Sequence, residues 1–526
     1  MPELNVFKNP EKHIKKIFSE VRIPEKNLTR CTGKAFASVF PTKRCPAGCP
    51  HCFFQSGMGV TECPSEMAEY SEHGMEQLIK FFNQANLGYL LVVGGGEPFQ
   101  TFHHVIKLVK EVETDRIVVV TNGMWGRDRS TAEKKIRELH KALMGRKTPT
   151  HLVLRLSVDQ EHVQQLGRDL VINIIGVFRE YFKDEEHFEL QLHGLMGDRA
   201  IDEIADLMGD ARIEASTIKV GATDNDTVMK ISPNRRIMSF GGDDYTIQIG
   251  MANRFYPSMA HDLSDPDADE IQRALKVFHD DMQNSSQDNP AVILNTDGSY
   301  GHNWWFDYNG NGCTYGNQQP TDQGNVYIHD YADFEDMLYG NIITYSVLDK
   351  GYTYRVERIA EVNPRAVLRA EAMNIRDYSG AALLEESKTV LYYAIRVIQD
   401  YLAEGTLTMA ELQGLSPELV ETIAMDRETL KKTYESAEHT IFEQYMSRTT
   451  FSEKDWQDLF VLVSRGHYEV TAAQIEKALS YYNSRATVRF NNISEVPYDA
   501  LGLHRRRTAL LNPMNPEAKY RCITSA

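Results

Sequence analysis

The feature that most constrains the fold is an alternation of short apolar runs and amphipathic segments between residues 35 and 193. The runs are rich in valine, isoleucine and leucine and nearly continuous in apolar character, which is typical of strands buried on both faces of a parallel sheet. The predicted strands are Ala35–Phe40, Tyr89–Val93, Ile117–Thr121, Leu152–Val158 and Phe188–His193. The intervening segments have helical periodicity, so the chain is predicted to be α/β, with its chemistry at the carboxyl ends of the strands.

The rest of the chain gives weaker signals. Thr246–Gly250 is predicted as a sixth strand, and Asp297-Gly298 predicts a hairpin turn between two extended arms. After about residue 340 the pattern becomes helical, and Ser416-Pro417 is a typical helix start. We therefore predict four parts: an N-terminal helical segment (1–30), an α/β domain (31–255), a hairpin-containing extension (256–340) and a helical C-terminal domain (341–526).

Composition excludes several classes of function. The chain has 57 Lys and Arg against 74 Asp and Glu, a formal charge of −17, which disfavours binding to nucleic-acid phosphates. We expect no membrane span and no secretory signal, because no apolar stretch is long enough for either. The 7 cysteines do not form a disulfide pattern, since three of them lie close together. They indicate a reducing, cytoplasmic compartment and a role in metal binding or chemistry.

The strongest local motif is a cysteine triplet directly after the first predicted strand. Cys45, Cys49 and Cys52 have the spacing C-x3-C-x2-C. Three thiolates on one loop can hold three irons of a four-iron cluster, and the fourth iron is then open to a substrate or cofactor. The alternative is a zinc knuckle, with a fourth ligand from Cys31, Cys63 or His51.

A glycine-rich turn ends the second predicted strand in the order Gly94-Gly95-Gly96-Glu97-Pro98. Glycines let the backbone approach a ligand closely, and an exposed carbonyl together with Glu97 can hold a cationic amino group. The alternative interpretation is a turn without a ligand.

These two motifs, in this order and at this distance, resemble those of the radical S-adenosylmethionine (AdoMet) superfamily, although His51 stands where that family has an aromatic residue. The resemblance implies a partial (β/α)6 barrel with a [4Fe–4S] cluster on Cys45, Cys49 and Cys52. It further implies that Gly95, Gly96 and Glu97 bind the methionine end of AdoMet, and that an electron donor such as flavodoxin or ferredoxin reduces the cluster.

The same resemblance assigns polar residues after the third and fourth predicted strands to AdoMet. Asn122, Ser157 and Asp159 would contact its ribose and carboxylate. The alternative for these side chains is turn formation and helix capping. His193, near the end of the fifth strand, either faces the barrel interior or is structural.

Residues 292–330 resemble the hairpin that opens the SPASM or twitch extension of peptide-modifying members of the superfamily, but only Cys313 is present there. An auxiliary cluster is therefore not expected. Cys313 is instead a candidate hydrogen-atom donor for radical epimerisation, with a buried, inert thiol as the alternative.

The predicted function is hydrogen abstraction by a 5′-deoxyadenosyl radical from a peptide or natural-product substrate. Two alternatives stay open. The first is radical oxidation or rearrangement of a small molecule such as an aminoglycoside or nucleoside. The second is a zinc-stabilised binding protein with a helical docking domain, which metal analysis would distinguish from an iron–sulfur enzyme.

Overall fold

The fold was analysed in a computed structural model that describes residues 5–47, 49, 69–195, 197–223, 226–252, 291–315, 324–364, 366–367 and 387–437. The chain divides into two compact units, each described here by itself. The sheet unit comprises Lys34–Phe255 and Phe306–Gly310. The helical unit comprises Met1–Gly33, Tyr256–Trp305 and Asn311–Ala526.

The sheet unit is built on parallel strands, as the sequence predicts. The strands are β1 (Ala35–Val39), β2 (Leu87–Val92), β3 (Arg116–Thr121), β4 (His151–Ser157), β5 (Phe188–Leu195) and β8 (Asp243–Ala252). They lie side by side in this order, each parallel to its neighbour. The α/β class and the sixth strand are confirmed, and within the described residues the sheet is open rather than closed.

An antiparallel pair that the sequence did not reveal continues the sheet beyond β8. β6 (Ala211–Thr223) pairs with β7 (Asp226–Phe240), and β7 pairs with β8. The sequence analysis placed no strand in this stretch, and Pro233 inside β7 argues against one, because proline cannot donate a hydrogen bond to a sheet ladder. The insertion explains why β8, although later in the chain, lies next to β5.

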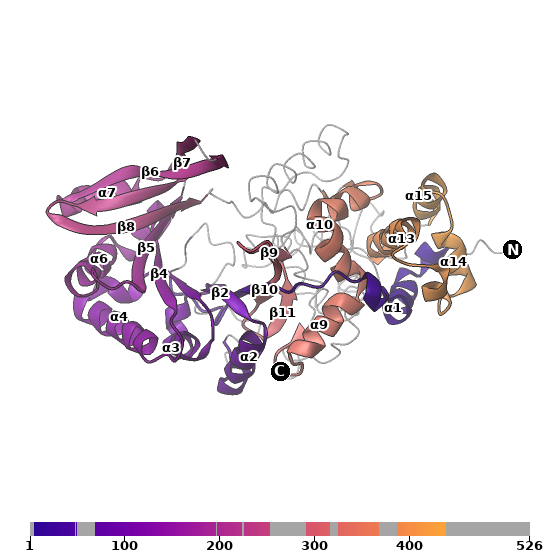
Figure 1. The fold of residues 1–526 in the computed structure, drawn as a ribbon, viewed down its shortest axis with the longest axis horizontal. Helices are drawn as coiled ribbons and strands as arrows, with labels where there is room; N and C mark the ends of the chain where they lie inside the picture. The colour runs from indigo at the N-terminus through magenta and orange to yellow at the C-terminus, as the bar shows by residue number, and fades with distance from the viewer. Residues whose placement is uncertain are drawn as a thin grey trace, which may run out of the picture. The chain divides into compact units, whose positions relative to one another are not determined.

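Helices cover one face of this sheet. Figure 1 shows α3, α4 and α6 along one face of the sheet. Apolar residues of β4 and β5 are buried. The bounds of these helices, with those of the other helices in the unit, are α2 (Glu72–Gln84), α3 (Phe102–Glu111), α4 (Arg129–Met144), α5 (Gln160–Leu166), α6 (Asp169–Tyr181) and α7 (Ala200–Met208). In β5 every second residue from Phe188 to Leu192 is buried, whereas Gln191 and His193 point to the opposite face and are only half-buried. The sheet therefore has an apolar face against helices and a more polar one.

The helical unit holds the predicted hairpin. β9 (Val292–Leu294) pairs antiparallel with β10 (Tyr300–Phe306), whose last residue belongs to the sheet unit. Gly298 turns the chain with φ of 84°, a conformation that favours glycine, and Asn295 N–H donates to Ser299 O at 2.8 Å. β11 (Asn311–Thr314) and β12 (Gly324–Asn325) form a second, shorter pair.

Over the part of the chain that the structure describes, the helical unit also contains several α-helices. They are α1 (Pro10–Glu20), α9 (Tyr331–Gly340), α10 (Ile342–Ala360), α13 (Ser387–Glu404), α14 (Pro417–Ile423) and α15 (Arg427–Ser436). Ser416 caps α14 by accepting from the N–H of Leu419, and Pro417 is its first residue, which confirms that start signal. Ser452 and Asp455, whose spacing predicts a capping box at another helix start, lie outside the described residues.

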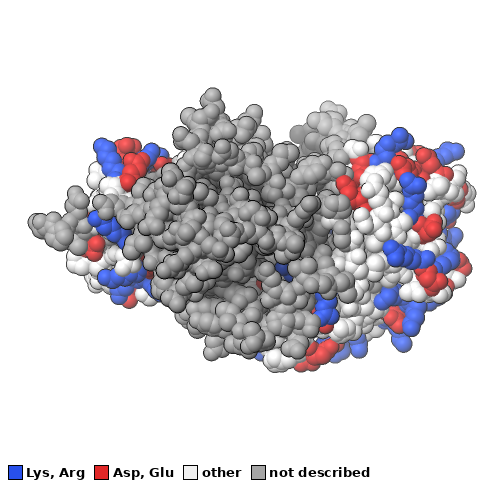
Figure 2. All heavy atoms as spheres, turned by 180° about the vertical axis from the view of Figure 1, so that it is seen from behind, with Lys and Arg blue, Asp and Glu red and all other residues white. Residues whose placement is uncertain are grey.

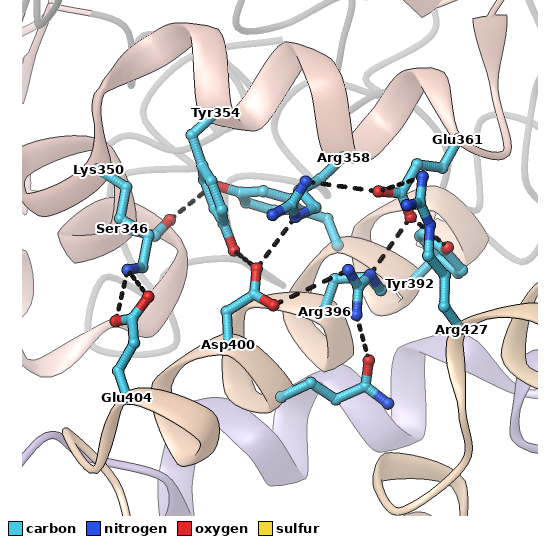
Figure 3. A network of polar contacts seen from close by, with 12 residues as sticks. Ser346, Lys350, Tyr354, Arg358, Glu361, Tyr392, Arg396, Asp400, Glu404 and Arg427 are labelled. Atoms are coloured by element: carbon cyan, nitrogen blue, oxygen red, sulfur yellow. Dashed lines mark hydrogen bonds and ion pairs between the residues drawn. The ribbon is translucent and has the colours of Figure 1, made fainter.

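Buried polar contacts join α10 to α13 (Figure 3). The Asp400 carboxylate accepts from the Tyr354 hydroxyl at 2.7 Å and from Arg358 Nε at 3.0 Å. Ser346 and Tyr393 share a hydrogen bond of 2.7 Å further along the same helices. These contacts give hydrogen-bond partners to polar groups that would otherwise lie between the two helices without one.

The described surface carries charges of both signs side by side in the view of Figure 2. None of the helices that the structure describes has the length and apolar character needed to span a bilayer.

Candidate active site

The cysteine loop leaves the carboxyl end of β1, where the sequence places it. Cys45 and Cys49 are half-buried and in no disulfide, and Cys52 lies outside the described residues. A bridge between Thr42 and Glu69 holds the two ends of the loop together. Such a loop brings cysteine sulfurs to the strand ends, and thiolates are the ligands that iron–sulfur clusters use, so the donor set fits a cluster.

The glycine-rich turn packs directly against this loop. The N–H of Glu97 donates to the carbonyl of Arg44 at 2.8 Å. A side chain on Gly96 would lie 2.3 Å from the same carbonyl oxygen, and one on Gly94 would lie 1.6 Å from the carbonyl oxygen of Gly96. Gly95 is buried between them. A larger residue at Gly96 would force the turn and the cysteine loop apart, whereas one at Gly94 would clash with the backbone of the turn itself. Gly96 therefore sets the distance between the turn and the loop.

Glu97 is a buried carboxylate whose hydrogen bonds within the described residues come from neutral groups. Its exposed fraction is 3%. Oε1 accepts from the Thr121 hydroxyl at 2.6 Å and from the N–H of Phe99 at 3.0 Å, and Oε2 accepts from the N–H of Asn122 at 2.8 Å. Burial raises the pKa of Glu97, while these hydrogen bonds oppose the rise. No described residue forms an ion pair with Glu97, so the carboxylate has no counter-charge among the described residues.

The end of β3 links the turn to the cysteine loop. Asn122 is 6% exposed, and its Nδ2 donates to Cys45 Sγ at 3.6 Å, which places it beside the expected cluster. Its Oδ1 accepts from the N–H of Met124 at 3.0 Å, so the side chain also shapes the turn. The contact with Met124 fits the turn interpretation of Asn122, and a contact with AdoMet stays a prediction.

Thr121 is the residue that the sequence analysis missed. Besides donating to Glu97, its hydroxyl accepts from Trp125 Nε1 at 3.0 Å and from the N–H of Gly123 at 3.1 Å. Thr121 therefore connects the Glu97 carboxylate to the turn after β3. A polar residue ending an otherwise apolar strand was the only sequence signal for this role.

Asp159 caps a helix. Its carboxylate accepts from the N–H of His162 at 2.9 Å and contacts His162 Nδ1 at 2.6 Å, which makes it the N-cap of α5. Capping was the alternative that the sequence left open for this residue. A contact with AdoMet stays a prediction for Asp159.

Ser157, at the end of β4, lies on the sheet face away from the helices. It is half-buried and stands opposite His193 of β5, which in turn stands opposite Gly250 of β8. Burial lowers the pKa of His193 to about 4, and nearby Arg155 adds to the effect, so the imidazole is neutral at physiological pH. Arg155 donates to Gln191 Oε1 at 3.2 Å on the same face. Polar groups thus gather where a parallel sheet places its chemistry.

Cys313 lies in β11 of the helical unit and is fully buried. Burial agrees with the inert alternative, and the donor role stays a prediction. Trp304 and Trp305 are buried at 0% and 2% exposure, as packing residues would be.

A family model described as a 4Fe-4S single cluster domain matches residues 30–160. The predicted [4Fe–4S] cluster is confirmed. The matched residues include the cysteine loop, the glycine-rich turn and the ends of β3 and β4, which is the part of the chain that the site occupies.

No curated protein matches the chain. Among solved structures, native anSMEcpe with bound AdoMet is similar at 11% identity and a TM-score of 0.33, over 74% of this chain and 99% of that chain. A hexahistidine-tagged form of anSMEcpe with bound AdoMet is similar at 11% identity and a TM-score of 0.31, over 77% of this chain and 98% of that chain.

Proposed function

We propose that the protein is a radical AdoMet enzyme whose site lies at the carboxyl ends of β1 to β5. A reduced [4Fe–4S] cluster held by Cys45, Cys49 and Cys52 would supply the one electron that cleaves AdoMet to methionine and a 5′-deoxyadenosyl radical, the species that would take hydrogen from the substrate. The observation that carries the proposal is the contact between the cysteine loop and the glycine-rich turn through Glu97 N–H and Arg44 O at 2.8 Å. It brings a thiolate loop together with a buried carboxylate that has no ion pair among the described residues.

Each part of the site has a task in this proposal. Cys45, Cys49 and Cys52 hold the cluster, and Asn122 donates to one of the sulfurs. Glu97 supplies negative charge for the ammonium group of AdoMet, because its own hydrogen bonds come from neutral donors. Ser157 offers a hydroxyl at the end of β4.

The cluster can be tested by replacing Cys45, Cys49 and Cys52 with Ala and reconstituting the protein anaerobically with iron and sulfide. We expect neither a cluster nor AdoMet cleavage, because the loop loses all its thiolates. Cys31→Ala is the matched control: burial raises the pKa of this thiol to about 11, which disfavours the thiolate needed for a ligand. Cluster assembly in the triple variant would contradict the proposal, and zinc in place of iron in the wild type would favour the binding-protein alternative.

We further propose a peptide or natural product as substrate, in a cytoplasmic enzyme reduced by flavodoxin or ferredoxin. The support is the hairpin of β9 and β10, whose sequence resembles the extension of peptide-modifying members. Oxidation or rearrangement of an aminoglycoside or nucleoside is the alternative, and the products formed from candidate substrates would distinguish the two.

Epimerisation is the most specific form of this proposal, and it depends on Cys313. A thiol holds its hydrogen weakly and can give a hydrogen atom to a carbon radical, whereas a serine hydroxyl cannot. The thiyl radical left on Cys313 would return to the thiol by taking one electron from the electron donor and one proton from solvent. Cys313→Ser should therefore cleave AdoMet and abstract substrate hydrogen without giving inverted product. In deuterated water the wild type should place one solvent deuterium on the inverted carbon. Full turnover by the serine variant would exclude Cys313 from the reaction.

A further inference from the structure

A second cluster of ligand-type side chains lies in the sheet unit, apart from the cysteine loop. It consists of Glu72, the first residue of α2, with His103 and His104 in the first turn of α3. His103 Nε2 lies 3.5 Å from Glu72 Oε1, and His104 Nε2 lies 3.6 Å from the same oxygen. One ligand atom from each residue lies within 4.8 Å of the other two.

The two separations between a histidine nitrogen and the Glu72 oxygen are those of ligands around one ion. Zinc binds nitrogen and carboxylate oxygen at about 2.0–2.2 Å with tetrahedral angles, which places two ligand atoms about 3.4 Å apart. Hydrogen bonds between nitrogen and oxygen are typically about 2.9 Å long, so the observed 3.5 and 3.6 Å are poor hydrogen bonds. The three side chains converge without bonding strongly to one another.

His104 provides an independent observation. The residue is 1% exposed, and neither of its ring nitrogens has a hydrogen-bond partner among the described residues. A buried polar atom without a partner costs about 1–3 kcal/mol, so such atoms call for an explanation. An ion on Nε2 would supply one of the two missing partners.

Lys107 supports a competing explanation, a cluster held by ion pairs alone. Its Nζ lies 3.2 Å from Glu72 Oε2 and 3.2 Å from Glu76 Oε1. It contacts the Glu72 oxygen that the histidines do not approach, and it repels a cation at the same carboxylate. The two explanations therefore predict opposite effects of removing Lys107 on zinc binding: a metal site predicts tighter binding, and an ion-pair cluster predicts weaker binding.

We propose that Glu72, His103 and His104 form a binding site for a divalent metal ion, with zinc as the best fit to two imidazoles and one carboxylate. Water would complete the tetrahedron, because Glu72 and His103 are 64% and 60% exposed at their side chains. The ion would join the first turns of α2 and α3. The turn that begins at Glu97 leads directly into α3, so the site would anchor that turn from outside the active site.

The test uses the holoenzyme with its iron–sulfur cluster reconstituted. Zinc is added by anaerobic equilibrium dialysis, and bound zinc, iron and sulfide are measured together, so that zinc replacing the cluster is recognised by lost iron. We expect one zinc per chain beyond an intact cluster. His103→Ala and Glu72→Gln should each weaken zinc binding by at least ~100-fold, since each removes a direct ligand.

His140→Ala is the matched control, because His140 also faces a carboxylate, that of Glu185 at 3.3 Å, without a second imidazole. It should bind zinc like the wild type. His104 is not varied, because truncating a buried ring could unfold the protein. Zinc should also raise the unfolding temperature of the wild type and of His140→Ala, but not of His103→Ala.

Lys107→Met decides between the two explanations. A metal site predicts tighter zinc binding, because the competing ammonium group is gone. Weaker binding in Lys107→Met would overturn the proposal. So would zinc binding that His103→Ala and Glu72→Gln leave unchanged, or the absence of zinc beyond the cluster in the wild type.

Discussion

Glu97 in the sheet unit and Glu361 in the helical unit are both buried, with opposite surroundings. The Glu361 side chain is 5% exposed and accepts from the Tyr392 hydroxyl at 2.7 Å (Figure 3). Three guanidinium groups also pair with it, those of Arg358 at 3.5 Å, Arg396 at 3.3 Å and Arg427 at 3.1 Å. Glu97 has hydrogen bonds from a hydroxyl and two backbone N–H groups and no ion pair with a described residue.

The difference separates a structural carboxylate from one that can receive a ligand. A buried ion pair is stable only when each charge is compensated, and Glu361 has its compensation within the fold. At Glu97 the donors that the structure describes are all neutral, and burial raises the pKa of the carboxyl accordingly. A cation from outside the chain would complete this site, whereas at Glu361 it would have to displace an arginine.

The largest effect is expected at Glu361, because arginines of the same chain compensate its charge. Glu361→Ala leaves Arg396, whose side chain is 10% exposed, with only its longer ion pair to the Asp400 carboxylate at 3.8 Å among the described residues. We expect a loss of ~3–5 kcal/mol in the free energy of unfolding, measured by denaturant titration. Glu404→Ala is the control, because it removes a 50% exposed partner of Lys350 and should cost ~0–1 kcal/mol. Equal losses in the two variants would mean that the Glu361 network is not structural.

Glu97→Gln tests the other half of the comparison. The amide keeps the shape but loses the charge, so AdoMet binding should weaken by ~1.5–3 kcal/mol, the range for a hydrogen bond to a charged group. Calorimetry on the reconstituted protein would measure it. Ser157→Ala should weaken binding less, because it removes a neutral hydroxyl. Unchanged affinity in Glu97→Gln would make Glu97 a second structural carboxylate.

The pH dependence gives a separate test of Glu97. Because burial raises its folded pKa above 4.5, the folded protein binds this proton more tightly than the unfolded chain does. Its contribution to stability is therefore greatest below pH 4.5 and is lost as the pH rises through the folded pKa. A bound ammonium group favours the charged form, so AdoMet affinity should fall as the pH drops from neutrality through that pKa. Glu97→Gln should lack this fall; the same fall in the variant would assign it to another group.

The sequence predicts the parallel strands well because burial on both faces produces continuous apolar runs, as in Val118–Val120. The cysteine loop and the glycine-rich turn were predictable because their spacing is local in the chain. The pair β6 and β7 was not, since β6, which the sheet order places outside β7, mixes polar and apolar residues and β7 contains Pro233.

Contacts between segments that are distant in the chain could not be predicted from the sequence either. Thr121 meets Glu97 across 24 residues of sequence, and only the pairing of β2 with β3 brings them together. The Glu361 network depends on how α10, α13 and α15 pack, and helical periodicity does not specify which charged residues meet. Asp159 differs from Thr121: its place after β4 led to a predicted contact with AdoMet, and the contact that the structure shows is a helix cap on α5.

The smallest expected effect concerns Asn122, which joins the two motifs. Its Nδ2 donates to Cys45 Sγ at 3.6 Å, and such a bond stabilises the more negative, reduced cluster. Asn122→Ala should therefore lower the reduction potential of the cluster. A net hydrogen-bond energy of ~0.5–1.5 kcal/mol corresponds to a shift of ~20–60 mV for one electron. Redox titration followed by electron paramagnetic resonance would measure it, with Ser157→Ala as a control that should leave the potential unchanged. An unaltered potential in Asn122→Ala, with the cluster fully assembled, would restrict Asn122 to shaping the turn through its contact with the N–H of Met124.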